Sequence, residues 1–263
     1  MDRFDTSVAH PARRYNYWLG GKDHFAADRE SGDLLAKAFP TALIAARENR
    51  DFLRRSVRFL ASQGVQQFLD IGTGLPVPDN THEIAQRIDP TARVLYADND
   101  PIVMTHSRAL TIGSPEGRTG YVEADVRAPE VILGHPELKA VLDLSEPVAL
   151  LLVAVLHFVH DDDEATRVVG ELLAALPPGS YLVASNLTLD YAPPAQVAKH
   201  EELLASGRTD ARARNRAEFG RFFEGLELVD PGIVAVSDWR PAAEERPSAQ
   251  DVAIYGAVGR LPS

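Results

Sequence analysis

The segment Phe68–Leu75 constrains the fold most, because a short apolar run leads directly into a glycine turn. Asp70 stands at the junction, just before Gly72 and Gly74. Two glycines one residue apart allow a tight turn and a close approach of the backbone to a ligand. Open parallel sheets bind small molecules at this end of their strands. We therefore expect an α/β sheet with a ligand site at this turn. The site should include Asp70, Gly72, Thr73 and Gly74.

The acid in this turn narrows the choice of ligand. A dinucleotide-binding turn has a third glycine, three residues after the second, and here that position is Val77. The carboxylate of Asp70 would repel a pyrophosphate and suits a cationic group, such as the amino group of S-adenosylmethionine. The D-x-G-x-G pattern resembles the first motif of class I methyltransferases. A strand end with a tight turn and no ligand is the structural alternative.

Short apolar runs and longer amphipathic stretches alternate from Val65 onward. Regular β–α alternation predicts a parallel sheet with helices on both faces, and right-handed crossovers make it doubly wound. The last strand follows a long connection and can pair antiparallel. The expected strands are Gln66–Ile71, Arg93–Ala97, Thr119–Ala124, Val148–Val153, Ser180–Ser185, Leu226–Val229 with an extension through Ile233–Val236, and Val252–Val258.

The helical stretches divide the chain into a core and two additions. We expect residues 1–64 to form an N-terminal helical lid, and residues 65–263 to form the core with a helical insert at 186–225, which Pro193-Pro194 breaks. Neither addition is able to fold alone, so we expect one domain over 1–263. The expected helices are Ala27–Phe39, Thr41–Gln63, Thr81–Arg87, Ile102–Ile112 and Glu164–Leu176, with an irregular region near Pro129–Leu138.

The composition excludes several classes of protein. The chain has 263 residues and no cysteine, which removes disulfides, thiolate nucleophiles and cysteine-based zinc sites. A net charge of −11 argues against a nucleic acid partner, whose binding depends on neutralising phosphates. No apolar run approaches the roughly 18 residues of a membrane span, and no signal peptide is visible. We therefore expect a cytoplasmic protein without a membrane partner.

Acids also end the second and third expected strands. Asp98 is placed to accept hydrogen bonds from two ribose hydroxyls, with Asn99 beside it as a further cofactor contact. Asp100 precedes a proline and fits a helix N-cap instead. Asp125 can accept from an adenine amino group while the backbone N–H of Val126 serves a ring nitrogen. The alternative for Asp125 is a helix cap.

Acids at the ends of three successive strands resemble motifs one to three of the S-adenosylmethionine-dependent methyltransferase fold. The chain also resembles an actinobacterial methyltransferase-like family, formerly a domain-of-unknown-function family, over about residues 10–260. This resemblance implies a mostly parallel, seven-stranded, Rossmann-like class I methyltransferase sheet with S-adenosylmethionine as cofactor, and it names no acceptor. The matching segments are residues 11–28, the most specific of them, and 49–55, 98–101, 156–159, 178–181, 239–241 and 255–260.

Methyl transfer from a sulfonium is an in-line displacement, so positioning is its main catalytic device, and a general base helps a hydroxyl or amine acceptor. The catalytic candidates are His157, which follows the fourth strand, and Tyr17, from the aromatic N-terminal segment. Lys22 is a candidate to bind the carboxylate of the cofactor, as are Arg47 and Arg50. For each of them, the alternative is a structural or solvent-exposed side chain.

The leading hypothesis is a methyltransferase that acts on a small-molecule acceptor, for example in secondary metabolism. The acid run Asp161–Glu164 directly precedes a helix, which favours helix capping over metal binding, so no metal is expected. One alternative is a non-catalytic or regulatory protein that binds S-adenosylmethionine on the same fold. A nicotinamide-dependent oxidoreductase shares the fold but is disfavoured by Asp70 and Val77.

Overall fold

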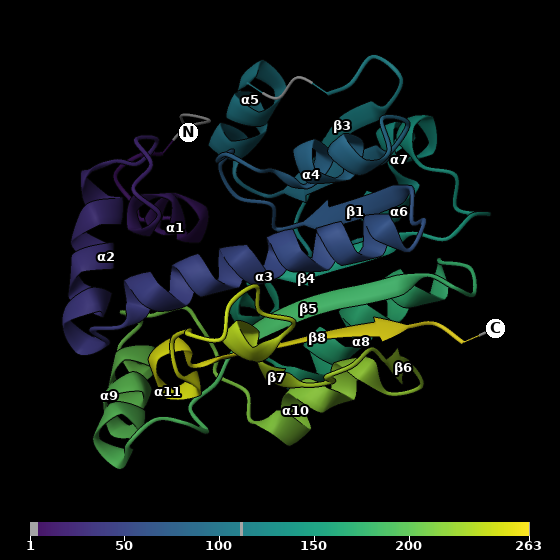
Figure 1. Cartoon of the computed structure of the whole chain (residues 1–263). Coiled ribbons are helices and arrows are strands. Elements are labelled where there is room, and N and C mark those ends of the chain that lie inside the picture. The colour runs from purple at the N-terminus through teal and green to yellow at the C-terminus, as the bar shows by residue number, and fades with distance from the viewer. Residues whose placement is uncertain (1–4, 111–112, 263) are drawn as a thin grey trace.

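One mixed sheet runs through the computed structural model, which describes residues 5–110 and 113–262 (Figure 1). The strand order is β3-β2-β1-β4-β5-β8-β6, and β7 pairs with β8 beside this path. Neighbouring strands from β3 to β5 are parallel, whereas β8 is antiparallel to β5, β6 and β7. The strands are β1 (Gln67–Ile71), β2 (Arg93–Asp98), β3 (Arg118–Glu123), β4 (Ala149–Val153), β5 (Tyr181–Leu187), β6 (Glu227–Leu228), β7 (Val234–Ala235) and β8 (Ile254–Arg260).

The doubly wound sheet and its antiparallel final strand are confirmed, with eight strands in place of seven. The sixth expected strand is divided into β6 and β7, both of which pair with β8. Pro231, which lacks an N–H, and Gly232, with φ of +80°, interrupt the run between them. The predicted start of the last strand at Val252 is wrong, because that residue ends a short helix.

Helices cover both faces of the sheet and one of its ends. They are α1 (Pro11–Trp18), α2 (Ala26–Ala38), α3 (Ala42–Ser62), α4 (Thr81–Ile88), α5 (Pro101–Leu110), α6 (Pro129–Gly134), α7 (Pro136–Val141), α8 (Asp162–Ala174), α9 (Pro194–Ala205), α10 (Arg216–Gly220) and α11 (Ala249–Val252). The described residues also form the 3₁₀ turns η1 (Leu156–Phe158), η2 (Arg221–Phe223) and η3 (Val236–Asp238).

Several helix boundaries differ from expectation for local reasons. The irregular region near residue 129 is two short helices, α6 and α7, each with a proline in its first turn. Pro194 likewise begins α9 and does not break a helix. Helix α1 was not expected at all. The expected end of α5 at Ile112 lies outside the described residues.

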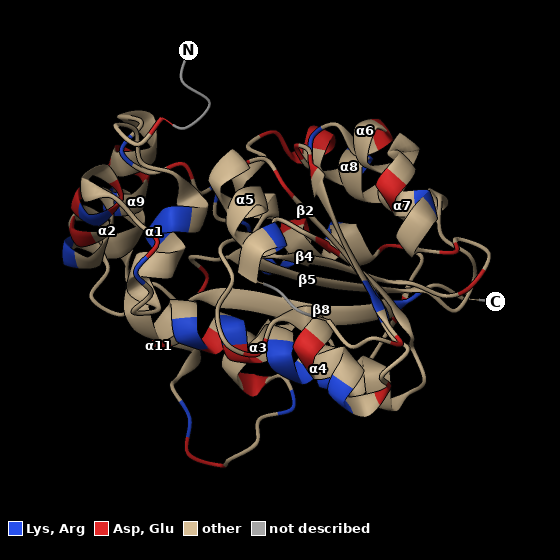
Figure 2. Cartoon of the chain, turned by 90° about the horizontal axis from the view of Figure 1, so that it is seen from above, with Lys and Arg blue, Asp and Glu red and all other residues tan. Residues whose placement is uncertain are grey.

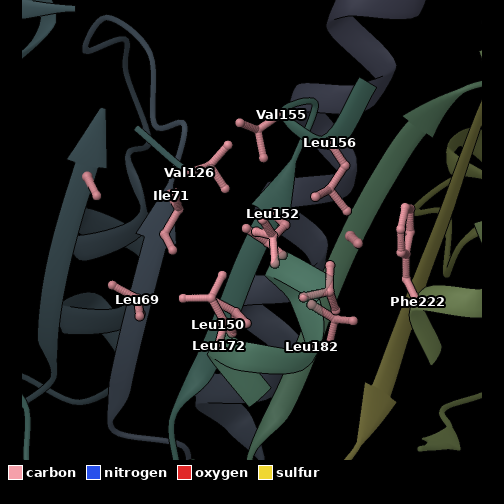
Figure 3. Close-up of a cluster of buried hydrophobic side chains, with 14 of the residues drawn as sticks. Leu69, Ile71, Val126, Leu150, Leu152, Val155, Leu156, Leu172, Leu182 and Phe222 are labelled. Atoms are coloured by element: carbon pink, nitrogen blue, oxygen red, sulfur yellow. The ribbon is translucent and has the colours of Figure 1, made fainter. Parts of the chain in front are cut away.

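Alternation along β4 shows how the core is divided between the two faces of the sheet. Leu150 and Leu152 belong to a buried cluster that includes Leu172 of α8 and Leu182 of β5 (Figure 3). Leu151, between them, belongs to a second cluster, formed with α3 and α4. Because successive strand residues point to opposite faces, an apolar run buried on both sides predicts such a central parallel strand. Figure 2 shows the layers, with α3 and α4 on one side of the sheet and α6, α7 and α8 on the other.

The additions to the core gather at one end of the sheet. Helices α1, α2 and α9 lie beyond the end toward which β1 points (Figure 1). Helix α3 runs from this group across the sheet and buries Phe52, Val57 and Leu60 completely. The carboxyl ends of the parallel strands are therefore covered by elements that come before and after the core in the sequence.

Candidate functional site

A cavity of about 550 Å³ lies at the carboxyl ends of the parallel strands, within the size range of small-molecule sites. The strand ends line one part of it, and α1, α2, α3, α9, α11, η1 and the segment after α9 also contribute to the lining. Most of the predicted site residues come together here: Asp70, Gly72, Thr73, Gly74, Asp98, Asn99, Asp125, Val126 and His157.

The glycine turn after β1 is fitted closely to its neighbours. Gly72 has φ of +75°, and a Cβ on it would lie 2.5 Å from Cγ2 of Val155. Gly74 has φ of +69°, but a Cβ there would meet nothing within 4 Å. The Gly74 N–H donates to Oδ2 of Asp98 at 2.9 Å, which ties the turn to the end of β2. The structure therefore requires glycine at position 72 for space as well as for backbone conformation.

Asp70 and Arg50 place opposite charges on the same cavity. The Asp70 carboxylate is buried and accepts a 2.6 Å hydrogen bond from the hydroxyl of Thr81. Burial raises the pKa of Asp70 to about 6, although Thr81 and the charge of Arg50 oppose the shift. The Arg50 guanidinium donates to the carbonyl of Asp79 at 3.0 Å, and its Nε has no partner among the described residues. A carboxylate and a guanidinium together are suited to the amino and carboxylate groups of an amino acid.

The two acids after β2 have separate roles. The Asp98 carboxylate lines the cavity, and Oδ1 accepts from the N–H of Asp100 at 3.0 Å. Burial raises the pKa of Asp98. Asp100 caps α5 by accepting from the N–H of Ile102 at 2.9 Å, as expected. It also lies 3.2 Å from the side chains of His10 and Arg13, which ties the N-terminal segment to this strand end.

Asp125 is held in place by Arg127. The guanidinium donates through Nη2 to Oδ2 at 2.6 Å and through Nε to Oδ1 at 2.9 Å. The side-chain hydrogen bonds from Arg127 lower the pKa of Asp125 to about 2. Asn99 adds a 3.2 Å hydrogen bond to Oδ2, which brings the second and third strand ends together. Asp125 is therefore an ionised acceptor at the cavity, with the backbone of Val126 beside it.

The part of the cavity farther from the glycine turn has a different character. His157 follows β4 in η1, and burial lowers its pKa to about 3. His200 of α9 is buried, and its pKa is also lowered by burial. Arg14 of α1 and Asp210, 196 residues later, form a 2.6 Å ion pair at the cavity. Sequence reasoning missed His200 and this pair, because no local pattern connects positions so far apart.

A buried chain of hydrogen bonds links the covering helices to the strand ends. The hydroxyl of Ser185 donates to Oδ1 of Asn49 at 2.6 Å and accepts from the N–H of Ala154 at 2.9 Å. The Asn49 amide donates to the Tyr15 hydroxyl at 3.1 Å. Ala154, directly after β4, has φ of +56°. These hydrogen bonds hold Ala154 in a left-handed backbone conformation at the cavity. Alanine adopts this conformation only at an energetic cost.

The structure does not bring Tyr17, Lys22 or Arg47 to the cavity. Tyr17 donates to Oδ1 of Asp33 at 2.9 Å, and Lys22 is exposed. Two residues along a helix correspond to about 200° of rotation, so Tyr15, which lines the cavity, and Tyr17 lie on different faces of α1.

Asp161 caps α8 by accepting from the N–H groups of Asp163 at 3.0 Å and Glu164 at 2.8 Å, which confirms the capping interpretation of this acid run. Over residues 5–110 and 113–262, no group of three or more histidine or acidic side chains is arranged to hold a metal ion. None of the helices in these ranges combines the length and apolar character needed to cross a membrane.

Comparison with known proteins places the chain in a family. A family model described as S-adenosyl methyltransferase matches residues 1–262. A protein of the DUF574 family from Streptomyces avermitilis is 49% identical over 98% of this chain and 99% of its own, with a TM-score of 0.93. A Thermobifida fusca protein, to which methyltransferase activity is ascribed, is 42% identical over 98% of this chain and 97% of its own, with a TM-score of 0.89.

More distantly related structures are similar to this chain in fold only. A methyltransferase from Methanosarcina mazei is 13% identical, covers 75% of this chain and 93% of its own, and has a TM-score of 0.52. The search of the curated proteins found no match. The glycine turn, the acids at three strand ends and the match along nearly the whole chain lead to the same assignment. The chain therefore belongs to the S-adenosyl methyltransferase family, and its cofactor is S-adenosylmethionine.

Proposed function

We propose that this protein transfers a methyl group from S-adenosylmethionine to a small-molecule acceptor. The observation that carries the proposal is one cavity lined by two chemically different sets of residues. One set comprises the carboxylates of Asp70, Asp98 and Asp125 at three strand ends, and the other comprises side chains of α1, α2 and α9 together with His157.

The residues of the first set fit the cofactor by their own chemistry. Asp70 and Arg50 would hold its amino and carboxylate groups, and Arg50 still has a buried Nε without a partner among the described residues. Asp98 would accept from the ribose hydroxyls, and Asp125 with the Val126 N–H would bind the adenine edge. The close packing of Gly72 on Val155 leaves backbone, and no side chain, facing the cofactor. Tyr17 and Lys22 have no role in this proposal.

The bound cofactor supplies an electrophilic methyl group on a sulfonium. The protein holds the acceptor in line with it, which is the main source of rate in such displacements. His157 lies in the part that would receive the acceptor and is neutral at physiological pH, because its pKa is about 3. It would accept a hydrogen bond from the acceptor O–H or N–H and so direct the lone pair of that atom. The acceptor atom would gain the methyl group and release its proton to solvent, and the demethylated cofactor would leave as a neutral thioether.

Calorimetric titration with S-adenosylmethionine and S-adenosylhomocysteine tests the cofactor part. We expect micromolar binding to the wild type and a loss of about 10- to 100-fold in Asp98→Asn, because one charged acceptor of the ribose hydroxyls is removed. Asp79→Asn is the matched control, since Asp79 is a carboxylate outside the cavity lining. An absence of binding to the wild type would contradict the proposed function.

A non-catalytic protein that binds the cofactor is the second candidate, and one observation favours it. The low pKa of His157 makes this residue a weak base. Incubation with methyl-labelled S-adenosylmethionine and a panel of small phenols and amines separates the two candidates. Labelled product from any acceptor, lost in His157→Phe, supports the enzyme. Tight cofactor binding with no transfer to any acceptor supports the second candidate.

A further inference from the structure

The part of the cavity between η1, α2 and α9 forms a pocket that we call the acceptor subsite, lined by Leu35, Phe39, His157, Leu187, Leu189 and His200. Resting on the proposed function, we propose that this subsite takes an uncharged, largely apolar ring that carries a hydroxyl or N–H group. We further propose that it discriminates against acceptors that carry a carboxylate or an ammonium group on the same ring.

The walls of the subsite are mostly aliphatic and aromatic. Leu35 and Phe39 come from α2 and its C-terminal end, while Leu187 and Leu189 come from the end of β5 and the residues after it. The Phe39 ring packs edge-on against His200, with 6.0 Å between ring centroids. Such walls favour apolar surface on a ligand, because its burial is favourable and the burial of an unpaired charge is costly.

The charges that border the subsite are already paired. Arg14 is 6% exposed, and its guanidinium lies 2.6 Å from the Asp210 carboxylate. It also donates to the Ser31 hydroxyl at 3.2 Å and packs over the ring of Trp18. Arg214, whose charge acts on His157 although it does not line the cavity, is paired with Asp162 at 2.9 Å. The Nε of Arg14 has no hydrogen-bond partner among the described residues, but the positive charge of the guanidinium is already balanced by Asp210. An anionic acceptor would therefore have to compete with Asp210 for Arg14.

Two neutral imidazoles provide the polar contacts that remain. His200 is 4% exposed, and its ring makes a hydrogen bond with the backbone of Ala211. Its Nε2 and the Nδ1 of His157 have no partner among the described residues. In a neutral imidazole, a nitrogen that donates to a carbonyl leaves the other nitrogen as an acceptor. His200, whose ring bonds the backbone of Ala211, therefore keeps Nε2 as an acceptor. A neutral imidazole at position 157 also keeps one acceptor nitrogen, and burial opposes the protonation of both rings.

Three probes with one ring and different charges test the inference. These are 2-naphthol, which is neutral, 2-naphthoate, which is anionic, and 2-naphthylmethylammonium, which is cationic. Their binding is measured by fluorescence to protein saturated with S-adenosylhomocysteine near neutral pH. We expect 2-naphthol to bind at least about tenfold more tightly than either charged probe, because transfer of an unpaired charge into such a site is costly.

Two variants sharpen the test. In His200→Phe, we expect 2-naphthol to bind more weakly while S-adenosylhomocysteine binds as before. In Asp210→Asn, the guanidinium of Arg14 loses its partner, so the preference for 2-naphthol over 2-naphthoate should shrink or reverse. Titration with S-adenosylhomocysteine verifies that each variant is folded.

The outcomes separate this inference from the function on which it rests. If S-adenosylhomocysteine binds but a charged probe equals 2-naphthol, or no probe binds, the inference is wrong and the proposed function stands. If S-adenosylhomocysteine itself does not bind, the proposed function is wrong and the inference is overturned with it.

Discussion

Gly72 and Gly74 have the same backbone conformation but different surroundings, which makes them a matched pair at the residue scale. Gly72→Ala adds a Cβ 2.5 Å from Val155 Cγ2, whereas Gly74→Ala adds one in open space. Both variants carry the strain of a left-handed alanine, about 1–2 kcal/mol. We predict that Gly72→Ala lowers the free energy of unfolding by a further 1–3 kcal/mol or so, as overpacking does. Urea denaturation of both variants measures the difference.

Truncation of the neighbour provides the control for this prediction. In the double variant Gly72→Ala/Val155→Gly, both the methyl groups and the Cβ of Val155, which lies 2.7 Å from the new Cβ, are removed. Its unfolding free energy, compared with that of Val155→Gly alone, should show a loss close to that of Gly74→Ala. An equal cost for the two single glycine variants would mean that contact with Val155 does not constrain the turn.

The buried carboxyl of Asp70 predicts a conflict between stability and function. Its pKa is about 6, above that of an aspartate in an unfolded chain. As pH rises from about 4 to 6, the folded protein keeps a proton that the unfolded chain releases, so the free energy of unfolding falls through this window. Above it, the ionised carboxylate is a constant penalty on the fold.

We therefore predict that Asp70→Asn, which keeps an acceptor for Thr81, raises the unfolding free energy by roughly 1–3 kcal/mol at neutral pH. The gain should shrink as pH approaches 4, because the wild-type carboxyl is then protonated too. The same variant should bind S-adenosylmethionine more weakly, since the amino group of the cofactor loses its counter-charge. Urea denaturation at several pH values and calorimetry measure the two effects. A variant less stable than the wild type at every pH would contradict the prediction.

At the scale of elements, Ser185 connects β5 to α3 and to the chain that leaves β4. Ser185→Ala leaves the Ala154 N–H and the Asn49 carbonyl without this partner, so we predict a loss of about 1–3 kcal/mol in unfolding free energy. Binding of S-adenosylhomocysteine should also weaken, because Ala154 and Val155 line the cavity beside the glycine turn. Thermal denaturation and calorimetry measure the two effects.

Ser180 provides the control for Ser185, since it is buried near the opposite end of the same strand. Its hydroxyl accepts from the N–H of Val148 at 3.1 Å, and it does not line the cavity. Ser180→Ala should therefore cost stability but leave the affinity for S-adenosylhomocysteine unchanged. A comparable loss of affinity in both variants would show that the effect is general destabilisation.

Elements differ in how much of their role could be predicted from sequence. The placement of Asp70, Asp98 and Asp125 at or next to the ends of three strands was predicted to within one residue, because apolar runs and turn residues are local signals. Helix α1 was not predicted, since its aromatic residues precede two glycines and resemble a flap. Once α1 is known, the helical period separates Tyr15 from Tyr17, but the choice between the two faces depends on packing against α3. The pairing of Arg14 with Asp210 depends on the whole fold and has no sequence signal.

At the scale of the whole molecule, the net charge is −11, so acidic side chains outnumber basic ones. Helices α3 and α4 carry many of the basic residues visible in Figure 2. Several of these are neutralised locally: Arg54 lies 2.8 Å from Asp51, and Arg87 lies 3.0 Å from Asp79. The absence of a nucleic acid partner remains our prediction, because the net negative charge opposes binding to phosphates.

The cavity is lined by strand ends on one side, which we call the floor, and largely by helices on the other, which we call the cover. This arrangement has a consequence for protein engineering. The floor lies at the ends of β1 to β4, whereas much of the cover comes from two stretches, residues 10–46 and 187–211. A graft that exchanges both stretches together would carry the Arg14–Asp210 pair with it and leave Asp70, Asp98 and Asp125 in place. A graft of residues 187–211 alone would leave the buried guanidinium of Arg14 without its charged partner. New acceptor preferences are therefore best sought in libraries that vary the two stretches as one unit.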